Sequence, residues 1–168
     1  MKKLLVVVDM QNDFVSGVLG TKEAQSIVKD IAKYVDTFDG DVAFTRDTHY
    51  ANYLDTQEGQ NLPVKHCIKD TEGWKIVPEI KITDSDFVFN KTTFGSTDLA
   101  VFARTGKYTE IEFVGVCTDI CVISNVLIMK ANMPESKIIV HKDLCAGVTP
   151  ESHETALKAM AACQVTII

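Results

Sequence analysis

Short, continuous apolar runs alternate with segments of helical periodicity along almost the whole chain. The first run, residues 4–8, consists of five aliphatic residues, which is typical of a parallel strand that is buried on both faces. Residues 23–34 follow it with apolar residues at helical spacing, so the two segments form a β-α unit. Repetition of this unit predicts a mostly parallel sheet with helices on both faces, a three-layer α/β/α fold.

Six segments have the composition of strands, and four have the periodicity of helices. The expected strands are residues 4–8, 41–45, 86–89, 110–116, 137–140 and 165–168. The expected helices are residues 23–34, residues 97–104, a helix that begins near residue 118, and residues 150–162. With 168 residues, of which 46% are hydrophobic, we expect one globular domain over residues 1–168.

Charge and cysteine usage restrict the class of partner and the compartment. The net charge of −6 is spread along the chain without a basic patch, so nucleic acid is not an expected partner. The longest apolar runs have the length of strands, so no membrane span is expected. Five cysteines without a C-x-x-C pair, and a strand at the very start of the chain, favour a reducing cytoplasm. The missing C-x-x-C pair also argues against a thiol redox protein.

Three chemically capable side chains stand at the ends of expected strands, where ligands bind in sheets of this type. Asp9 follows the first strand, Lys91 the third and Cys121 the fourth. Taken singly, such residues are more often a turn former, a solvated lysine and an inert thiol. Their convergence on one edge of the sheet predicts a charged site in which the lysine offsets the cost of burying the carboxylate.

Cys121 is placed like a nucleophile. It lies where the helix after the fourth strand should begin, with Thr118 or Asp119 as the N-cap. The positive end of a helix dipole lowers the pKa of a thiol, so we expect the pKa of Cys121 to fall from about 8.5 toward neutrality. The thiolate is the form that attacks carbonyl carbon. The other four cysteines are interpreted as structural thiols: Cys67, Cys117, Cys145 and Cys163.

A second group of residues lies in the irregular stretch 47–84, which is too long for an ordinary loop. It contains two carboxylates and two imidazoles, at Asp47, His49, Glu58 and His66. These side chains suit zinc, and also iron or manganese. On the residues alone, a metal site and a chance cluster of surface acids and histidines are equal alternatives.

Three ordered segments resemble the isochorismatase-like family of cysteine hydrolases and, within it, the nicotinamidases. They are DMQNDF at residues 9–14, NKTTF at residues 90–94 and GVCTDICV at residues 115–122. The resemblance covers nearly the whole chain. It implies a Rossmann-like hydrolase fold, in agreement with the pattern of strands and helices.

The resemblance implies a catalytic triad of Asp9, Lys91 and Cys121 that hydrolyses a small amide through a thioester on the cysteine. It also implies a cis peptide bond between Val116 and Cys117. The backbone N–H groups of Cys117 and Cys121 would then form the oxyanion hole.

The resemblance further makes Asp47, His49 and His66 ligands of a divalent metal ion, with Glu58 as the variable ligand. Zinc is favoured, and iron or manganese are alternatives. In nicotinamidases this ion holds the pyridine nitrogen of the substrate.

Two aromatic residues are assigned to the substrate pocket. Phe14 resembles the aromatic pocket wall of the family, with packing in the core as the alternative. Trp74 is assigned to the pocket as well, with a subunit contact or internal packing as alternatives. Pro63 stands where some nicotinamidases carry an aromatic residue that stacks on the substrate, and this difference leaves the substrate open.

The sequence therefore predicts a metal-assisted amidohydrolase, with nicotinamide as the favoured substrate. Another small-amide or carbamoyl amidohydrolase of the family is the first alternative, and a non-catalytic binding module on the same fold is the second. An isochorismatase is less favoured because vinyl-ether chemistry does not need the cysteine. The resemblance also implies a homo-oligomer, either a dimer or a tetramer. His141 and His153 are assigned no role.

Overall fold

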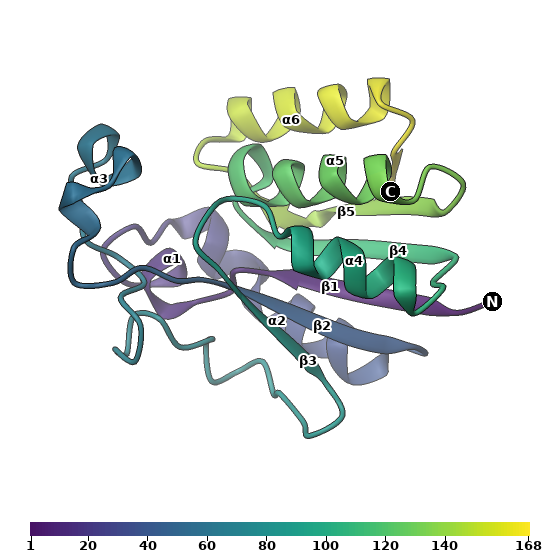
Figure 1. The fold of residues 1–168 in the computed structure, drawn as a ribbon, viewed down its shortest axis with the longest axis horizontal. Coiled ribbons are helices and arrows are strands. Elements are labelled where there is room, and N and C mark those ends of the chain that lie inside the picture. The colour runs from purple at the N-terminus through teal and green to yellow at the C-terminus, as the bar shows by residue number, and fades with distance from the viewer.

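The computed structural model describes residues 1–168 and contains a six-stranded sheet between two layers of helices (Figure 1). The strand order is β3-β2-β1-β4-β5-β6, and every pair of neighbours is parallel. The strands are β1 (Lys3–Val8), β2 (Asp41–Asp47), β3 (Phe87–Lys91), β4 (Glu110–Val116), β5 (Lys137–Ala146) and β6 (Thr166–Ile167). The predicted fold class is confirmed, and the sheet is wholly parallel.

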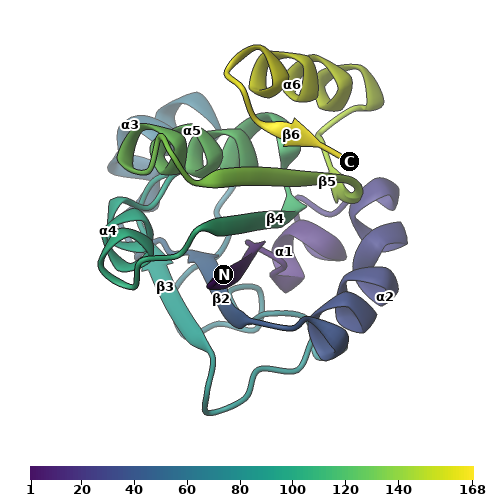
Figure 2. The same ribbon diagram turned by 90° about the vertical axis from the view of Figure 1, so that its right-hand side faces the viewer.

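Five of the six helices cover the sheet, in one group on each face (Figure 2). The six helices are α1 (Asn12–Val15), α2 (Lys22–Thr37), α3 (Gln57–Asn61), α4 (Thr97–Thr105), α5 (Ile123–Asn132) and α6 (Pro150–Ala162), with a 3₁₀ turn η1 (Tyr53–Asp55) and a π-helical turn η2 (Thr118–Val122). Side-chain oxygens of Thr21, Ser96 and Thr149 cap α2, α4 and α6. The helices α1 and α2 cover one face, and α4, α5 and α6 cover the other.

The central strand β1 shows why these elements assemble as they do. Leu4, Val6 and Val8 pack into the core beneath α4, α5 and α6, whereas Leu5 and Val7 pack into the core beneath α1 and α2. Successive side chains of a strand point to opposite faces, so a strand that is covered on both sides is apolar at every position. Burial of each such side chain contributes about 1.5–3 kcal/mol.

The start of the helix after β4 differs from the prediction. The chain first makes the π-helical turn η2, in which the N–H of Val122 donates to the carbonyl of Cys117 at 3.0 Å. Neither Thr118 nor Asp119 caps the helix, because their side chains contact α6 and the loop before it. Cys121 therefore lies within a π-helical turn, a feature that is frequent at functional sites.

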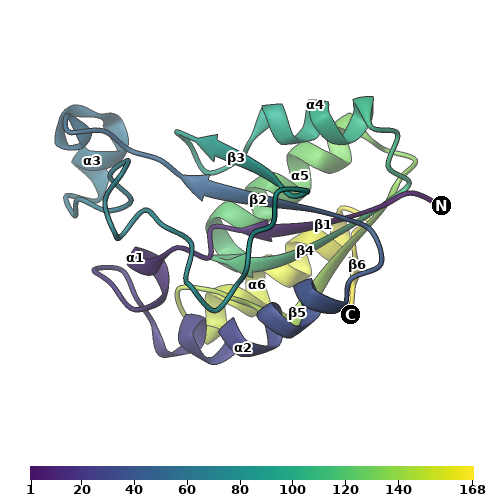
Figure 3. The ribbon, with the colours of Figure 1, turned by 90° about the horizontal axis from the view of Figure 1, so that it is seen from below.

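The stretch between β2 and β3 contains only η1 and α3 as helical segments, and α3 lies beyond the carboxyl ends of the strands (Figure 3). Strand β5 continues past the predicted residues 137–140, because a shift in register lets it resume pairing with β4 at Cys145. None of the helices has the length and apolar character needed to span a lipid bilayer.

Strands β1 and β4 lie side by side at the point where the strand order reverses. The chain leaves β1 toward β2 on one side and leaves β4 toward β5 on the other. In open α/β sheets, ligands bind outside the carboxyl ends of the strands at such a switch point. Asp9 follows β1 directly, and the turn that carries Cys121 follows β4. The topology therefore brings these two segments together.

Gly115 is required by the close approach of β4 to β1. Its φ is +116°, and a Cβ atom there would lie 2.2 Å from the carbonyl oxygen of Val8. We expect Gly115→Ala to lower the free energy of unfolding by about 2–4 kcal/mol, because both the positive φ and the backbone clash oppose a side chain. Urea denaturation measures this change, and a difference below about 0.5 kcal/mol would contradict the explanation.

Candidate active site

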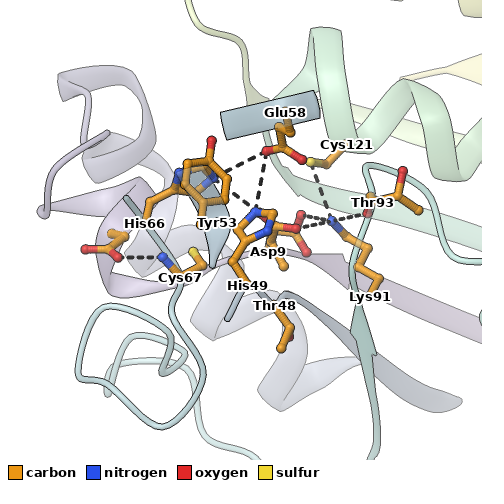
Figure 4. Close-up of polar contacts among 12 residues, drawn as sticks. Asp9, Thr48, His49, Tyr53, Glu58, His66, Cys67, Lys91, Thr93 and Cys121 are labelled. Atoms are coloured by element: carbon orange, nitrogen blue, oxygen red, sulfur yellow. Dashed lines mark hydrogen bonds and ion pairs between the residues drawn. The ribbon is translucent and has the colours of Figure 1, made fainter. Parts of the chain in front are cut away.

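Three side chains from three different elements meet at the carboxyl edge of the sheet (Figure 4). The Nζ atom of Lys91 lies 2.6 Å from Oδ2 of Asp9 and 3.6 Å from Sγ of Cys121. The exposed fractions of Asp9, Lys91 and Cys121 are 0%, 4% and 5%. The structure thus brings together the three residues of the predicted triad, in a setting with little solvent to screen their charges.

Burial and mutual charge shift the pKa values of these groups. Burial raises the pKa of Asp9 more than Lys91 lowers it. Burial alone would lower the pKa of Lys91, but the carboxylates of Asp9 and Asp47, together with Cys121 when it is a thiolate, raise it, so the ammonium stays charged. Burial, together with the charge of Asp9, raises the pKa of Cys121 well above its usual value.

The expectation of a depressed thiol pKa is therefore wrong for the free protein. Loss of solvation and the carboxylate of Asp9 raise the pKa of Cys121, and the ammonium of Lys91 offsets them only in part. The thiol is protonated at rest, so its attack on a substrate requires a proton acceptor beside it.

Asp9 is held by both its backbone and its side chain. It has a φ of +49°, a left-handed conformation that costs a non-glycine residue about 1–2 kcal/mol. Its N–H donates to the backbone oxygen of Thr45, and the hydroxyl of Thr45 donates to Oδ1 of Asp9 at 2.6 Å. One carboxylate oxygen thus faces the threonine and the other faces Lys91.

The segment 9–14 also fastens the irregular stretch to the sheet. Nε2 of Gln11 donates to the carbonyl of Asp47 at 2.8 Å, and Oε1 of Gln11 accepts from the N–H of Asp47 at 2.7 Å. Asp13 Oδ2 accepts from the N–H of Cys67 at 2.8 Å. No pattern in the sequence indicates these roles of Gln11 and Asp13, although both residues lie in the first of the three segments that resemble the family.

The four residues of the second predicted group also converge. One ligand atom from each of Asp47, His49, Glu58 and His66 lies within 4.8 Å of all the others. Nε2 of His49 is 2.9 Å from Oδ2 of Asp47 and 3.4 Å from Oε1 of Glu58. Nε2 of His66 is 3.4 Å from the same oxygen of Asp47. Two carboxylates and two imidazoles form a donor set that suits zinc, iron or manganese.

Several observations show that these residues fit a divalent cation. Nδ1 of His66 donates to the carbonyl of Val64 at 2.8 Å, which directs Nε2 as the ligand atom toward the cluster. Oδ1 of the buried Asp47 lies 3.6 Å from Nζ of Lys91 without a hydrogen bond, which leaves Oδ2 as the oxygen that faces both imidazoles. Burial lowers the pKa of His49, but Asp47 and Glu58 outweigh it and raise it to about 9. A proton therefore competes with a metal ion for His49.

A cavity of about 730 Å³ opens beside both groups, a size that suits a small ligand. It reaches the four-residue cluster at His49 and Glu58, and its wall includes Thr93, whose carbonyl accepts from Lys91, and Ile120, the neighbour of Cys121. Its apolar and aromatic lining residues are Tyr50, Tyr53, Leu62, Phe94 and Ile120. These wall residues were not predicted from the sequence, although Phe94 and Ile120 lie inside segments that resemble the family.

The two aromatic residues assigned to the pocket lie behind the cluster, and neither lines this cavity. The Phe14 ring packs against the ring of His66 at 5.5 Å between centroids. Trp74 is buried; its Nε1 donates to Oγ1 of Thr48 at 2.8 Å, and the guanidinium of Arg46 lies 3.8 Å above its ring. These contacts indicate that Trp74 supports the end of β2, which carries Asp47.

The peptide bond between Val116 and Cys117 is cis, as the resemblance implied.

Comparisons with known proteins place this geometry in a family. The model of the isochorismatase domain matches residues 3–168. The nicotinamidase of Saccharomyces cerevisiae is 29% identical in an alignment that is 168 positions long, gaps included, and that covers 71% of this chain and 77% of that protein. The zinc complex of the pyrazinamidase of Pyrococcus horikoshii superposes with a TM-score of 0.89 at 25% identity and covers 100% of this chain and 99% of that one. The N-carbamoylsarcosine amidase of Thermoplasma acidophilum gives a TM-score of 0.82 at 28% identity over 99% of this chain and 95% of that one. The chain belongs to the isochorismatase family.

Proposed function

We propose that this protein is a cysteine-dependent amidohydrolase that converts nicotinamide to nicotinate and ammonia. The observation that carries the proposal is the convergence of a carboxylate, an ammonium and a thiol beside a cavity and a four-residue metal-type cluster. The comparisons support the predicted class, an amidohydrolase that acts on carbon–nitrogen bonds.

In the first half of the reaction, Asp9 accepts the proton of the Cys121 thiol, and the sulfur attacks the amide carbon. Because burial raises the pKa of Asp9, this carboxylate is a stronger base than an exposed aspartate. Lys91 lies in contact with both groups and compensates the negative charge that passes from one to the other.

The tetrahedral intermediate then breaks its carbon–nitrogen bond. Asp9 returns its proton to the amide nitrogen, which departs as ammonia and leaves a thioester on Cys121. A water molecule adds to the thioester carbon, and the carbon–sulfur bond breaks to give the carboxylic acid and the free thiol. We assign stabilisation of the oxyanion to the backbone N–H groups of Cys117 and Cys121, since loss of one such donor costs about 10²–10³ in rate.

Asp47, His49, Glu58 and His66 are the residues that would hold a divalent metal ion, and we propose zinc. When bound, the ion supplies a Lewis acid at the cavity wall that can bind a heteroatom of the substrate. The protein itself contributes the position of these donors through Gln11, Asp13 and Val64, and it contributes the apolar residues of the cavity wall.

A carbamoyl amide is the second candidate substrate. The structural similarity to an N-carbamoylsarcosine amidase at 28% identity favours it. The thiol attacks a carbamoyl group and releases ammonia from it in the same way. The residues of the cavity, and not those of the triad, would therefore determine which of the two substrates is used.

The proposed reaction requires Cys121 as a free thiol, and all five cysteines are unpaired in the structure. We therefore assign the protein to the cytoplasm. A homo-oligomer remains a prediction from the resemblance.

Ammonia release from nicotinamide tests the proposal directly, together with removal of metal. We expect turnover by the metal-loaded protein, and a loss of at least about tenfold after treatment with a chelator, the scale on which changes around a metal site alter activity. Addition of zinc, iron or manganese should restore the rate, and metal analysis should give one ion per chain.

A parallel assay with N-carbamoylsarcosine separates the two candidate substrates, because each releases ammonia by the same chemistry. Release from N-carbamoylsarcosine alone would replace the first substrate by the second. No release from either compound by a metal-loaded protein would overturn the amidohydrolase proposal. If metal analysis finds no ion and the activity persists in the presence of a chelator, the metal site is no part of the proposed function.

A further inference from the structure

Asn125 of α5 is buried, with an exposed fraction of 1%, and its side-chain amide makes three hydrogen bonds. Nδ2 donates to the carbonyl of Cys121 at 2.8 Å and to the carbonyl of Phe94 at 3.1 Å. Oδ1 accepts from the N–H of Ser96 at 2.9 Å. This single amide therefore joins the turn that carries Cys121 to the loop between β3 and α4.

That loop also holds Lys91. The carbonyl of Thr93 accepts a hydrogen bond from Nζ of Lys91 at 3.2 Å, and Thr93 is the residue before Phe94. The loop backbone lies directly on α5, because a Cβ atom at Gly95 would lie 2.4 Å from Cδ1 of Ile128. The hydrogen bonds of Asn125 to Phe94 and Ser96 hold the same loop against α5.

We propose that Asn125 is a positioning residue that sets the distance between the sulfur of Cys121 and the ammonium of Lys91. It contacts neither reacting atom. It acts on Cys121 through the backbone carbonyl of that residue and on Lys91 through the loop of residues 92–96. Since a displacement of about 1 Å can cost about 10² in rate, a joint of this kind affects turnover without touching the substrate. The inference rests on the proposed function for its effect on turnover.

The same helix offers a matched control in Asn132. Nδ2 of Asn132 donates to the carbonyl of Ile128 at 3.0 Å, four residues earlier, as Nδ2 of Asn125 does to the carbonyl of Cys121. Asn132 ends α5 and has no bond to the loop after β3. The control thus separates the loss of one asparagine-to-carbonyl bond in α5 from the loss of the link between the Cys121 turn and the loop of residues 92–96.

The decisive variant is Asn125→Asp, which keeps the size of the side chain and the acceptor for the N–H of Ser96. It replaces the donor Nδ2 by a carboxyl oxygen, so that at most one of the two donated bonds can remain, and only when the carboxyl group is protonated. We expect kcat to fall about 10- to 100-fold with a much smaller change in KM. Alkylation of Cys121 by iodoacetamide, followed by mass spectrometry of its peptide, should slow as well, because a displaced Lys91 stabilises the thiolate less. Asn132→Asp should match the wild type in both measurements.

A second variant, Asn125→Ser, keeps the test open if the aspartate variant does not fold. A helical serine can donate to the carbonyl four residues earlier, so it retains a bond to Cys121 but is too short for the loop. We expect its kcat and alkylation rate to lie between those of the wild type and Asn125→Asp. Wild-type kcat and alkylation rates per folded molecule in the folded variants would overturn the inference.

The alkylation measurement also keeps this inference apart from the proposed function. Should the wild type release no ammonia from any amide, the proposed function fails. A slower alkylation of Cys121 in Asn125→Asp would still support the positioning role of Asn125, and an unchanged rate would overturn that role.

Discussion

Cys121→Ala is expected to abolish ammonia release from nicotinamide, with a loss of about 10⁴–10⁶ in kcat, the scale on which removal of a nucleophile acts. Alanine cannot form the thioester, and no other thiol lies at the position that Lys91 and Asp9 surround. The fold should persist, because the change removes a single sulfur atom from a residue already enclosed by the core and costs about 1 kcal/mol.

Cys145→Ala is the matched control, because Cys145 is another buried thiol of the same core cluster. Its sulfur lies near the carbonyl of Phe113, away from the cavity. We expect this variant to keep the kcat of the wild type while it loses a similar amount of stability. Ammonia release and thermal unfolding are measured on both variants. Substantial activity in Cys121→Ala would overturn the assignment of the nucleophile.

The fold could be predicted because its main determinant is local. Residues 4–8 of β1 are all apolar because both faces of the sheet are covered, and α2 shows its buried stripe at Ala24, Ile27, Val28 and Ile31. The end of β1 at Val8 follows from the polar residue after its apolar run, whereas β2 and β3 continue two residues past the predicted ends, to Asp47 and Lys91. The convergence of Asp9 and Cys121 follows from the parallel sheet, since all carboxyl ends lie on one edge.

The π-helical turn and the direction of the thiol pKa could not be predicted, for different reasons. Apolar periodicity does not distinguish an i−4 bond from an i−5 bond in the first turn of a helix, so Val122 and Cys117 gave no signal. The pKa of Cys121 depends on burial and on the charge of Asp9, which come from distant parts of the chain.

The supporting residues of the candidate site were missed because their roles are bonds between distant segments. Gln11 pairs with Asp47 across 36 positions, and Asn125 bonds to Ser96 across 29. Side-chain amides at these positions have no periodic pattern that marks them. Trp74 was assigned to the pocket on its aromatic character, whereas the donor Nε1 and the cation above its ring show a packing role.

Lys91→Met is expected to lower kcat by at least about 10³, within the range that proton transfer contributes to catalysis. Lys91 is the cation in contact with the buried carboxylate of Asp9. Without it, the pKa of Asp9 rises further than burial already raises it, and a protonated Asp9 cannot accept the proton of the thiol. The methionine fills a similar volume, so we expect the variant to fold.

The stability of Lys91→Met should depend on pH in a defined direction. Removal of one partner from a buried ion pair costs about 3–5 kcal/mol when the remaining charge stays ionised. A carboxyl group whose pKa is raised by folding binds its proton more tightly in the folded state. Stability therefore falls as the pH rises from the unfolded pKa through the folded one. The deficit of the variant relative to the wild type should be smaller at pH 5 than at pH 8.

Lys137→Met provides the control for this measurement, because Lys137 pairs with Glu110 at 3.3 Å but its side chain is 57% exposed. Loss of this pair should change stability by less than about 1 kcal/mol, because the carboxylate of Glu110 keeps its second ion pair, with Nζ of Lys3 at 3.4 Å. Urea denaturation of both variants and the wild type at pH 5 and pH 8 gives the four differences needed. A deficit of Lys91→Met that is equal at the two pH values, or as small as that of Lys137→Met, would show that Asp9 does not depend on Lys91 for its charge. The role assigned to Lys91 would then have to be given up, because its distances to Asp9 and Cys121 would carry no energetic weight.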